Sequence, residues 1–97
     1  MSIKVYITHL AGNQVTNGNQ RKLKHILDTN KISYTEIDIS DPNNSNEKEN
    51  LQRLLASMNK KLRLPQVIIN DEYCCDFDEV QSAVESETLS DLLKLNN

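Results

Sequence analysis

The sequence has few of the residues that carry redox or metal chemistry. Its 97 residues include two cysteines, two histidines, two glycines, two prolines and no tryptophan. Because Cys74 and Cys75 are adjacent, the chain has no C-x-x-C redox pair, no zinc-ligand spacing and no disulfide framework. His9 and His25 stand apart from other ligand residues, so we expect neither a metal nor another cofactor.

Long apolar runs and clustered positive charges are also absent. No run approaches the roughly 20 apolar residues of a membrane span, and the first residues lack the apolar core of a signal peptide. The net charge of −3 argues against a basic nucleic-acid surface. We therefore expect a single domain over residues 1–97, in the cytoplasm, with no nucleic-acid or membrane partner.

Residues 64–73 predict a strand that starts at a proline and is followed by a hairpin. The run 67–69 is β-branched without polar alternation, which is typical of a strand buried on both faces. Asn70 and Asp71 follow as a two-residue turn, because both residue types tolerate positive φ. Pro65 has no N–H for a sheet ladder, so it belongs at the first position of its strand or at an edge.

The rest of the chain alternates strand and helix patterns. The order β-α-β-α-β-β-α-α predicts an α/β protein with a four-stranded mixed sheet flanked by helices, the thioredoxin-like arrangement. We expect strands at residues 3–8, 32–39, 67–69 and 72–75, and helices from about 17–19 to 29, from 46 to 60, from 76 and from 88. Capping boxes are expected at Asn46-x-x-Glu49 and Asp76-x-x-Glu79. The third helix should bury Phe77, Val80, Ala83 and Val84.

Residues 9–19 are expected to form a long loop, since both glycines of the chain lie there among asparagines. A loop of this length in a compact α/β domain is either functional or mobile. The glycine spacing does not match the phosphate-binding pattern G-x-x-x-x-G-K-[ST]. The candidates for an interaction loop are His9, Leu10, Gly12, Asn13, Thr16 and Asn17.

Runs along the whole chain also stand at the spacing of a known family. They are Ile3-Lys4-Val5-Tyr6, Ile26-Leu27-Asp28, Asp38-Ile39-Ser40, Pro65-Gln66, Asp71-Glu72-Tyr73-Cys74 and Leu92-Leu93-Lys94-Leu95. Together they resemble the SH3-domain-binding glutamic-acid-rich-like family of glutaredoxin-like proteins in the thioredoxin superfamily, particularly its short member. Residues 64–70 also resemble the glutaredoxin segment in which the proline is cis, so the resemblance implies a cis-proline at Pro65.

The resemblance implies a redox-inactive protein that is not an enzyme. Active glutaredoxins place a cysteine at the start of the first helix, where the helix dipole lowers its pKa. Residues 10–20 contain no cysteine here, and the Thr16 hydroxyl without a base does not perform thiol exchange. With only Pro42 and Pro65 the chain has no P-x-x-P segment, so polyproline recognition is not favoured.

The family resemblance also implies a vestigial glutathione groove. Leu64 and Pro65 match its strand-start side, and Phe77 and Asp78 match the turn that starts the third helix. A structural explanation is favoured over a retained site: Pro65 shapes the strand start, Phe77 packs in the core and Asp78 stabilises a helix N-terminus. Any glutathione affinity is expected to be weak, because no cysteine is present there to form the mixed disulfide.

The favoured function is a non-catalytic protein-interaction or modulator domain. The groove, the 9–19 loop or the edge strand near 72–75 would contact a protein of unknown identity. The alternative is weak glutathione binding, or a residual thiol-dependent oxidoreductase that uses Cys74 or Cys75. Adjacent cysteines rarely bridge, and Asp76 beside them is expected to raise a thiol pKa, so structural thiols are favoured. A purely structural or dimerising domain is the third possibility.

Overall fold

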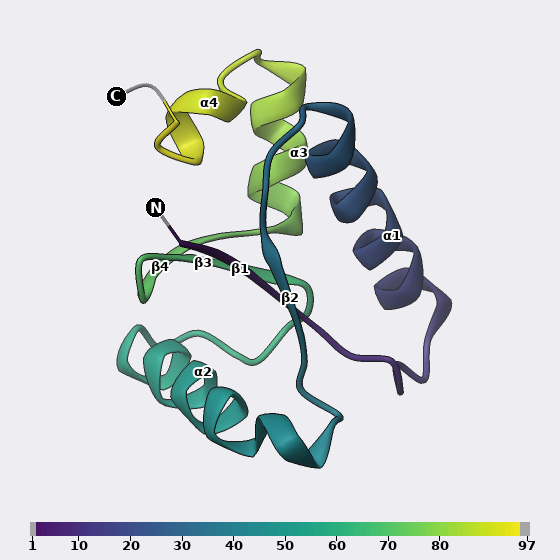
Figure 1. The fold of residues 1–97 in the computed structure, drawn as a ribbon, viewed down its shortest axis with the longest axis vertical. Helices are drawn as coiled ribbons and strands as arrows, with labels where there is room; N and C mark the ends of the chain where they lie inside the picture. Colours follow the sequence, from purple (N-terminus) through teal and green to yellow (C-terminus); the bar gives the residue numbers. More distant parts are fainter. Residues whose placement is uncertain (1, 96–97) are drawn as a thin grey trace.

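A four-stranded mixed sheet with helices on both faces forms the centre of the molecule (Figure 1). The computed structural model describes residues 2–95. The elements are β1 (Ile3–Ile7), α1 (Gln14–Thr29), β2 (Thr35–Asp38), the 3₁₀ turn η1 (Pro42–Asn44), α2 (Ser45–Ser57), β3 (Gln66–Ile69), β4 (Glu72–Asp76), α3 (Phe77–Glu85) and α4 (Leu89–Leu92). The strand order is β2-β1-β3-β4. β1 and β2 are parallel, whereas β3 is antiparallel to both β1 and β4. The predicted thioredoxin-like arrangement is confirmed.

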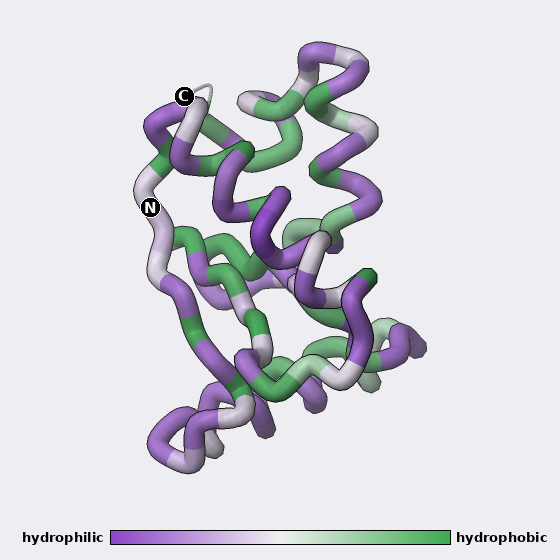
Figure 2. Tube along the Cα trace, turned by 90° about the vertical axis from the view of Figure 1, so that its right-hand side faces the viewer, coloured by the Kyte–Doolittle hydropathy of each residue, from purple (hydrophilic) through white to green (hydrophobic). Residues whose placement is uncertain are grey.

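Two apolar cores lie on opposite faces of this sheet. On one face, α1, α3 and α4 cover a core that includes Val67 and Ile69 of β3. On the other face, α2 covers a core that includes Ile68. Because successive side chains of a strand point to opposite faces, β3 contributes to both cores and is buried along its whole length. Figure 2 shows hydrophobic positions gathered along the central strands.

The first helix begins earlier than the sequence predicts. Asn13 caps α1, and its side-chain Oδ1 accepts a hydrogen bond from the Thr16 backbone N–H at 2.6 Å. The expected loop therefore ends at Asn13, and Gly18 lies inside the helix without a positive φ. The glycine signal misled because a helix tolerates an interior glycine at a cost of about 1 kcal/mol relative to alanine.

The two predicted capping boxes have different outcomes. At α3, Asp76 Oδ1 accepts from the Glu79 backbone N–H at 2.9 Å, and Glu79 Oε1 accepts from the Asp76 backbone N–H at 3.3 Å, which confirms that box. At α2, the box at Asn46 is wrong, because the preceding η1 turn brings the helix start forward to Ser45. The cap residue Asn44 makes no side-chain bond to the helix, and its Nδ2 donates instead to the Asp38 carbonyl at 2.9 Å. α2 also ends at Ser57 rather than at residue 60.

Three further details define the β3–α3 region. The turn residues Asn70 and Asp71 have φ values of 52° and 66°, as expected for a two-residue hairpin. Val84 is 41% exposed, so the expectation that it faces inward is wrong. The sheet ladder slips between Val67 and Ile68, which marks a β-bulge in β4.

Candidate functional site

A shallow groove lies where the start of β3 meets the start of α3. Its lining residues come from three separated segments and are Asn19, Arg63, Leu64, Pro65, Asp76, Phe77 and Asp78. The structure thus brings together the four residues to which the family resemblance points. The Leu64–Pro65 peptide bond is cis, as the resemblance implies. We call this set of lining residues the Pro65 groove.

Local chemistry explains how the Pro65 groove is assembled. Pro65 directly precedes β3, where its missing N–H leaves no gap in the sheet ladder. α3 follows β4 without an intervening loop, because Asp76 ends the strand and caps the helix at once. Phe77 is buried in the core, whereas Asp78 is exposed in the first turn of α3, where the helix dipole favours a carboxylate.

The groove has no nucleophile from α1. The residue of α1 that lines it is Asn19, five positions after the first helical residue, Gln14. At the helical rise of 1.5 Å per residue, the positive end of the helix lies about 7.5 Å further along the axis. In a thiol enzyme, a helix N-terminus activates the nucleophilic thiol. The Pro65 groove is lined by neither such a thiol nor the N-terminus of α1.

The size of the groove limits what it can hold. Its volume is about 40 Å³, whereas sites that enclose small molecules measure roughly 300–1,000 Å³. Arg63, Asp76 and Asp78 give its rim charges of both signs. This geometry suits a surface contact with an extended chain or a side chain rather than the enclosure of a small molecule.

The six interaction-loop candidates are divided between a loop and the first turn of α1. His9, Leu10, Gly12 and Asn13 precede the helix, whereas Thr16 and Asn17 belong to it. The His9 Nδ1 atom lies 3.1 Å from Asp38 Oδ2. Burial raises the pKa of Asp38, but hydrogen bonds from Ser40 and from the His9 backbone N–H outweigh it and hold that pKa below its usual value.

Gln20 fixes the start of this loop, a role that the sequence analysis missed. It is buried, its Oε1 accepts from the Thr8 backbone N–H at 2.9 Å, and its Nε2 donates to the Thr8 carbonyl at 3.0 Å. The available signal was its position three residues before Leu23 and seven before Leu27, on the buried stripe of α1. A polar residue on an apolar stripe needs hydrogen-bond partners, which here are backbone groups.

Two exposed apolar side chains lie near the start of α1. Leu10 is 77% exposed in the loop, and Val15 is 72% exposed in the first turn of α1. Val15 and Asn19 are four residues apart and so lie on the same face of α1. Val15 therefore lies one helical turn from Asn19, toward the start of α1. Val15 was not among the predicted candidates. It lies eleven residues, about three turns, before Ile26 and so on the same side of α1, where the sequence pattern alone indicates a packed residue.

The cysteines lie in β4, outside the residues that line the groove. Both are free thiols, and Cys75 is completely buried. A hydrogen bond with Cys74 and burial raise the pKa of Cys75. The expectation that Asp76 raises a thiol pKa is confirmed for Cys75, where the Asp76 charge adds to the rise. The pKa of Cys74 is instead lowered, mainly by its hydrogen bond with Cys75.

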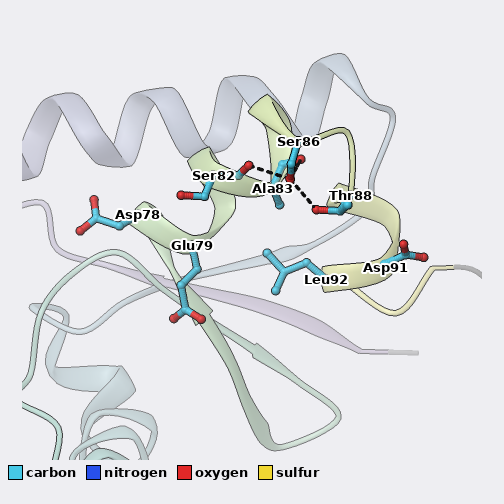
Figure 3. Close-up of a pocket in the computed structure, with 8 residues that line it drawn as sticks. All are labelled: Asp78, Glu79, Ser82, Ala83, Ser86, Thr88, Asp91 and Leu92. Carbon is cyan, nitrogen blue, oxygen red and sulfur yellow. Dashed lines mark hydrogen bonds between the residues drawn. The ribbon is translucent and has the colours of Figure 1, made fainter.

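A second, wider hollow lies between α3 and α4 (Figure 3). It measures about 670 Å³ and is lined by Asp78, Glu79, Ser82, Ala83, Ser86, Thr88, Asp91 and Leu92. The Ser86 hydroxyl donates to the Ser82 carbonyl at 3.0 Å and lies 2.8 Å from the Thr88 hydroxyl. Within residues 2–95, no group of three or more histidine, cysteine, aspartate or glutamate side chains is placed to hold a metal ion. In that same range, no helix has the length and apolar character needed to cross a membrane.

Comparisons with known proteins agree on the fold. The chain is 34% identical to the SH3 domain-binding glutamic acid-rich protein homolog of Drosophila melanogaster, over 98% of this chain and 65% of the relative. Actin interacting protein Aip5 of C. albicans matches with a TM-score of 0.74 at 23% identity, covering 95% of this chain and 87% of that one. Glutaredoxin C1 of Populus tremula x tremuloides matches with a TM-score of 0.67 at 20% identity, covering 95% and 82%.

These structural matches show a glutaredoxin-like fold. The model of one family, described as SH3-binding, glutamic acid-rich protein, matches residues 1–96. This match and the Drosophila relative cover nearly the whole chain. The chain belongs to the SH3-binding, glutamic acid-rich protein family.

Proposed function

We propose that this protein is a non-catalytic interaction domain that binds a protein partner with the Pro65 groove and the exposed apolar residues near the start of α1. The observation that carries the proposal is a groove beside the cis Pro65 to which α1 contributes the amide of Asn19 and no thiol. The family description and the name of the Drosophila relative both refer to protein binding. Aip5 is named as an actin-interacting protein, which also supports a protein partner.

The contact surface combines polar and apolar groups. In the proposed surface Leu10 and Val15 supply exposed apolar side chains, and Arg63 and Asp78 of the Pro65 groove supply charges of opposite sign. Burying one such aliphatic side chain contributes roughly 1.5–3 kcal/mol. Two such side chains add binding free energy when the partner covers them and excludes water.

Val15→Asp should abolish partner binding, and Val84→Asp on α3 is its matched control. Both valines are exposed on helices. Val15 lies one turn from Asn19 of the groove, whereas Val84 lies about two turns from Phe77, near the far end of α3. The measurement is quantitative capture from a cell extract on immobilised wild-type protein and both variants. Partners of the proposed surface should be lost with Val15→Asp and kept with Val84→Asp. Equal capture by all three proteins would exclude this surface.

Weak glutathione binding is a second candidate, because Leu64, Pro65, Phe77 and Asp78 lie together. A titration of isotope-labelled protein with reduced glutathione, followed through the backbone amides of residues 64–66 and 76–79, tests it. A hydroxyethyl-disulfide reduction assay run beside it tests for catalysis, and we expect no turnover. Turnover would contradict the non-catalytic assignment, whereas amide shifts without turnover would support an inherited ligand groove. The cytoplasmic location expected from the sequence stays a prediction.

A further inference from the structure

The β-bulge in β4 places two adjacent cysteines on one face of the sheet. Val67 pairs with Cys75 and Ile68 pairs with Tyr73, so Cys74 is the extra residue of the bulged strand. Neighbouring side chains of a regular strand point to opposite faces. Here Cys75 belongs to the core under α1 and α3, and Cys74 packs against that same core. The bulge therefore brings together two thiols that a regular strand would separate.

The two sulfur atoms are close enough to react. Their separation is 3.0 Å, about 1 Å more than the roughly 2.05 Å of a disulfide bond. Cys74 is half-buried, and its Sγ also lies 3.5 Å from the Leu92 carbonyl oxygen of α4. Cys75 has no exposed surface. A reagent from solution therefore meets Cys74 first.

The environments of the two thiols give them different chemical roles. The hydrogen bond with Cys75 lowers the pKa of Cys74, whereas that same bond and burial raise the pKa of Cys75. The thiolate is the nucleophile in thiol–disulfide exchange. Cys74 is thus suited to attack an incoming disulfide, and Cys75 is held within reach of the mixed disulfide that results.

We propose that Cys74 and Cys75 form a reversible oxidation site. A small-molecule disulfide oxidises the two thiols to a disulfide bond between these adjacent residues. The Cys74 thiolate attacks one sulfur of the small disulfide, whose S–S bond breaks and releases one thiolate. Cys75 then gives up its proton and attacks the Cys74 sulfur, which releases the second small thiol. The two protein thiols lose two electrons and two protons, and the small disulfide gains them as two thiols.

The covalent geometry makes this bond a labile one. Adjacent Cα atoms are about 3.8 Å apart across a trans peptide, below the range of about 4.4–6.8 Å usual for disulfides. Strained disulfides are more readily reduced than structural ones and serve as labile or regulatory bonds. The site is therefore a modification that small thiols reverse. It is distinct from the proposed protein-binding function, because neither cysteine lines the Pro65 groove.

Intact-mass analysis after oxidation tests the proposal. Reduced protein is incubated with glutathione disulfide, quenched with N-ethylmaleimide and measured. Because the chain has only two cysteines, a monomer that has lost two hydrogen atoms and takes up no maleimide must contain the Cys74–Cys75 bond. We expect this species for the wild type, and dithiothreitol should restore two alkylatable thiols. Cys75→Ala should stop at the mixed disulfide with glutathione, and Cys74→Ala should react little.

Two outcomes would overturn the proposal. One is a wild-type protein that accumulates the glutathione mixed disulfide, or stays unmodified, without losing two hydrogen atoms. The other is a disulfide-linked dimer in place of the closed monomer. Both readings come from the wild type alone, so they hold even if Cys75→Ala does not fold. In guanidinium the protein unfolds and the bulge is lost, so the Cys74–Cys75 disulfide of the wild type should form more slowly than in the folded protein.

Discussion

Single residues decide where α1 begins and how stable it is. Asn13 starts the helix with a side-chain bond to Thr16, although the asparagines and glycines around it read as a loop. Gly18 then lies within the helix, has no positive φ, and has nothing within 4 Å of the position of an added Cβ. The sequence signal failed here because a capping side chain and a tolerated glycine use the same residue types as a loop.

Gly18→Ala should stabilise the protein by about 0.5–1 kcal/mol. Alanine restricts the unfolded chain and favours the helix, and the structure offers no steric obstacle to its methyl group. The measurement is the free energy of unfolding from urea denaturation of both proteins. A loss of stability would mean that Gly18 is not in an ordinary helical conformation, and would contradict the early start of α1.

At the scale of elements, α3 is positioned by its cap and α2 is not. Both helices carry a capping-box pattern, but the two boxed bonds form only at Asp76 and Glu79. Asp76 is both the last residue of β4 and the N-cap of α3. Its capping hydrogen bonds therefore also position Phe77 and Asp78, which form one side of the Pro65 groove. At α2, the η1 turn provides the entry instead, and Asn46 is already inside the helix.

Asp76→Ala should therefore destabilise the protein by about 0.5–2 kcal/mol, the usual cost of losing an N-cap. Asn46→Ala is the matched control from the other box pattern, and its effect should stay within about 0.5 kcal/mol, as for an ordinary surface change. Thermal or urea unfolding of the two variants measures the difference. Equal effects would contradict the different starts of α2 and α3.

Across the whole molecule, hydrogen bonds link β-strand tyrosines to carboxylates on two helices. Tyr6 of β1 donates to Glu47 of α2 at 2.7 Å, and Tyr73 of β4 donates to Glu79 of α3 at 2.9 Å. Burial is the largest cause that raises both tyrosine pKa values, followed by these hydrogen bonds. The two pairs connect the sheet to α2 and to α3.

Stability should therefore fall at alkaline pH. The folded protein holds both phenols protonated above their unfolded pKa of about 10. Because the pKa values of Tyr6 and Tyr73 are raised in the folded protein, the two tyrosines contribute their full stabilisation below about pH 10. This stabilisation is lost as the pH rises toward the folded pKa values. Urea unfolding between pH 8 and pH 11 (roughly spanning that unfolded pKa) measures this loss. The fall should be shallower in Tyr6→Phe and Tyr73→Phe, and an unchanged slope in both variants would contradict the assignment.

The sequence by itself determined the order of elements, the buried β3 strand, the Asn70-Asp71 turn, the α3 cap and the absence of a cysteine near the start of α1. These features depend on residues that are neighbours along the chain, or on residue identity alone. Only the tertiary structure decided that Gln20 anchors Thr8, that Asn19 meets Pro65 and Phe77 in one groove, and that a bulge brings Cys74 and Cys75 to one face. Those features depend on pairing between distant segments, and a ladder slip of one residue is enough to reverse which face a side chain occupies.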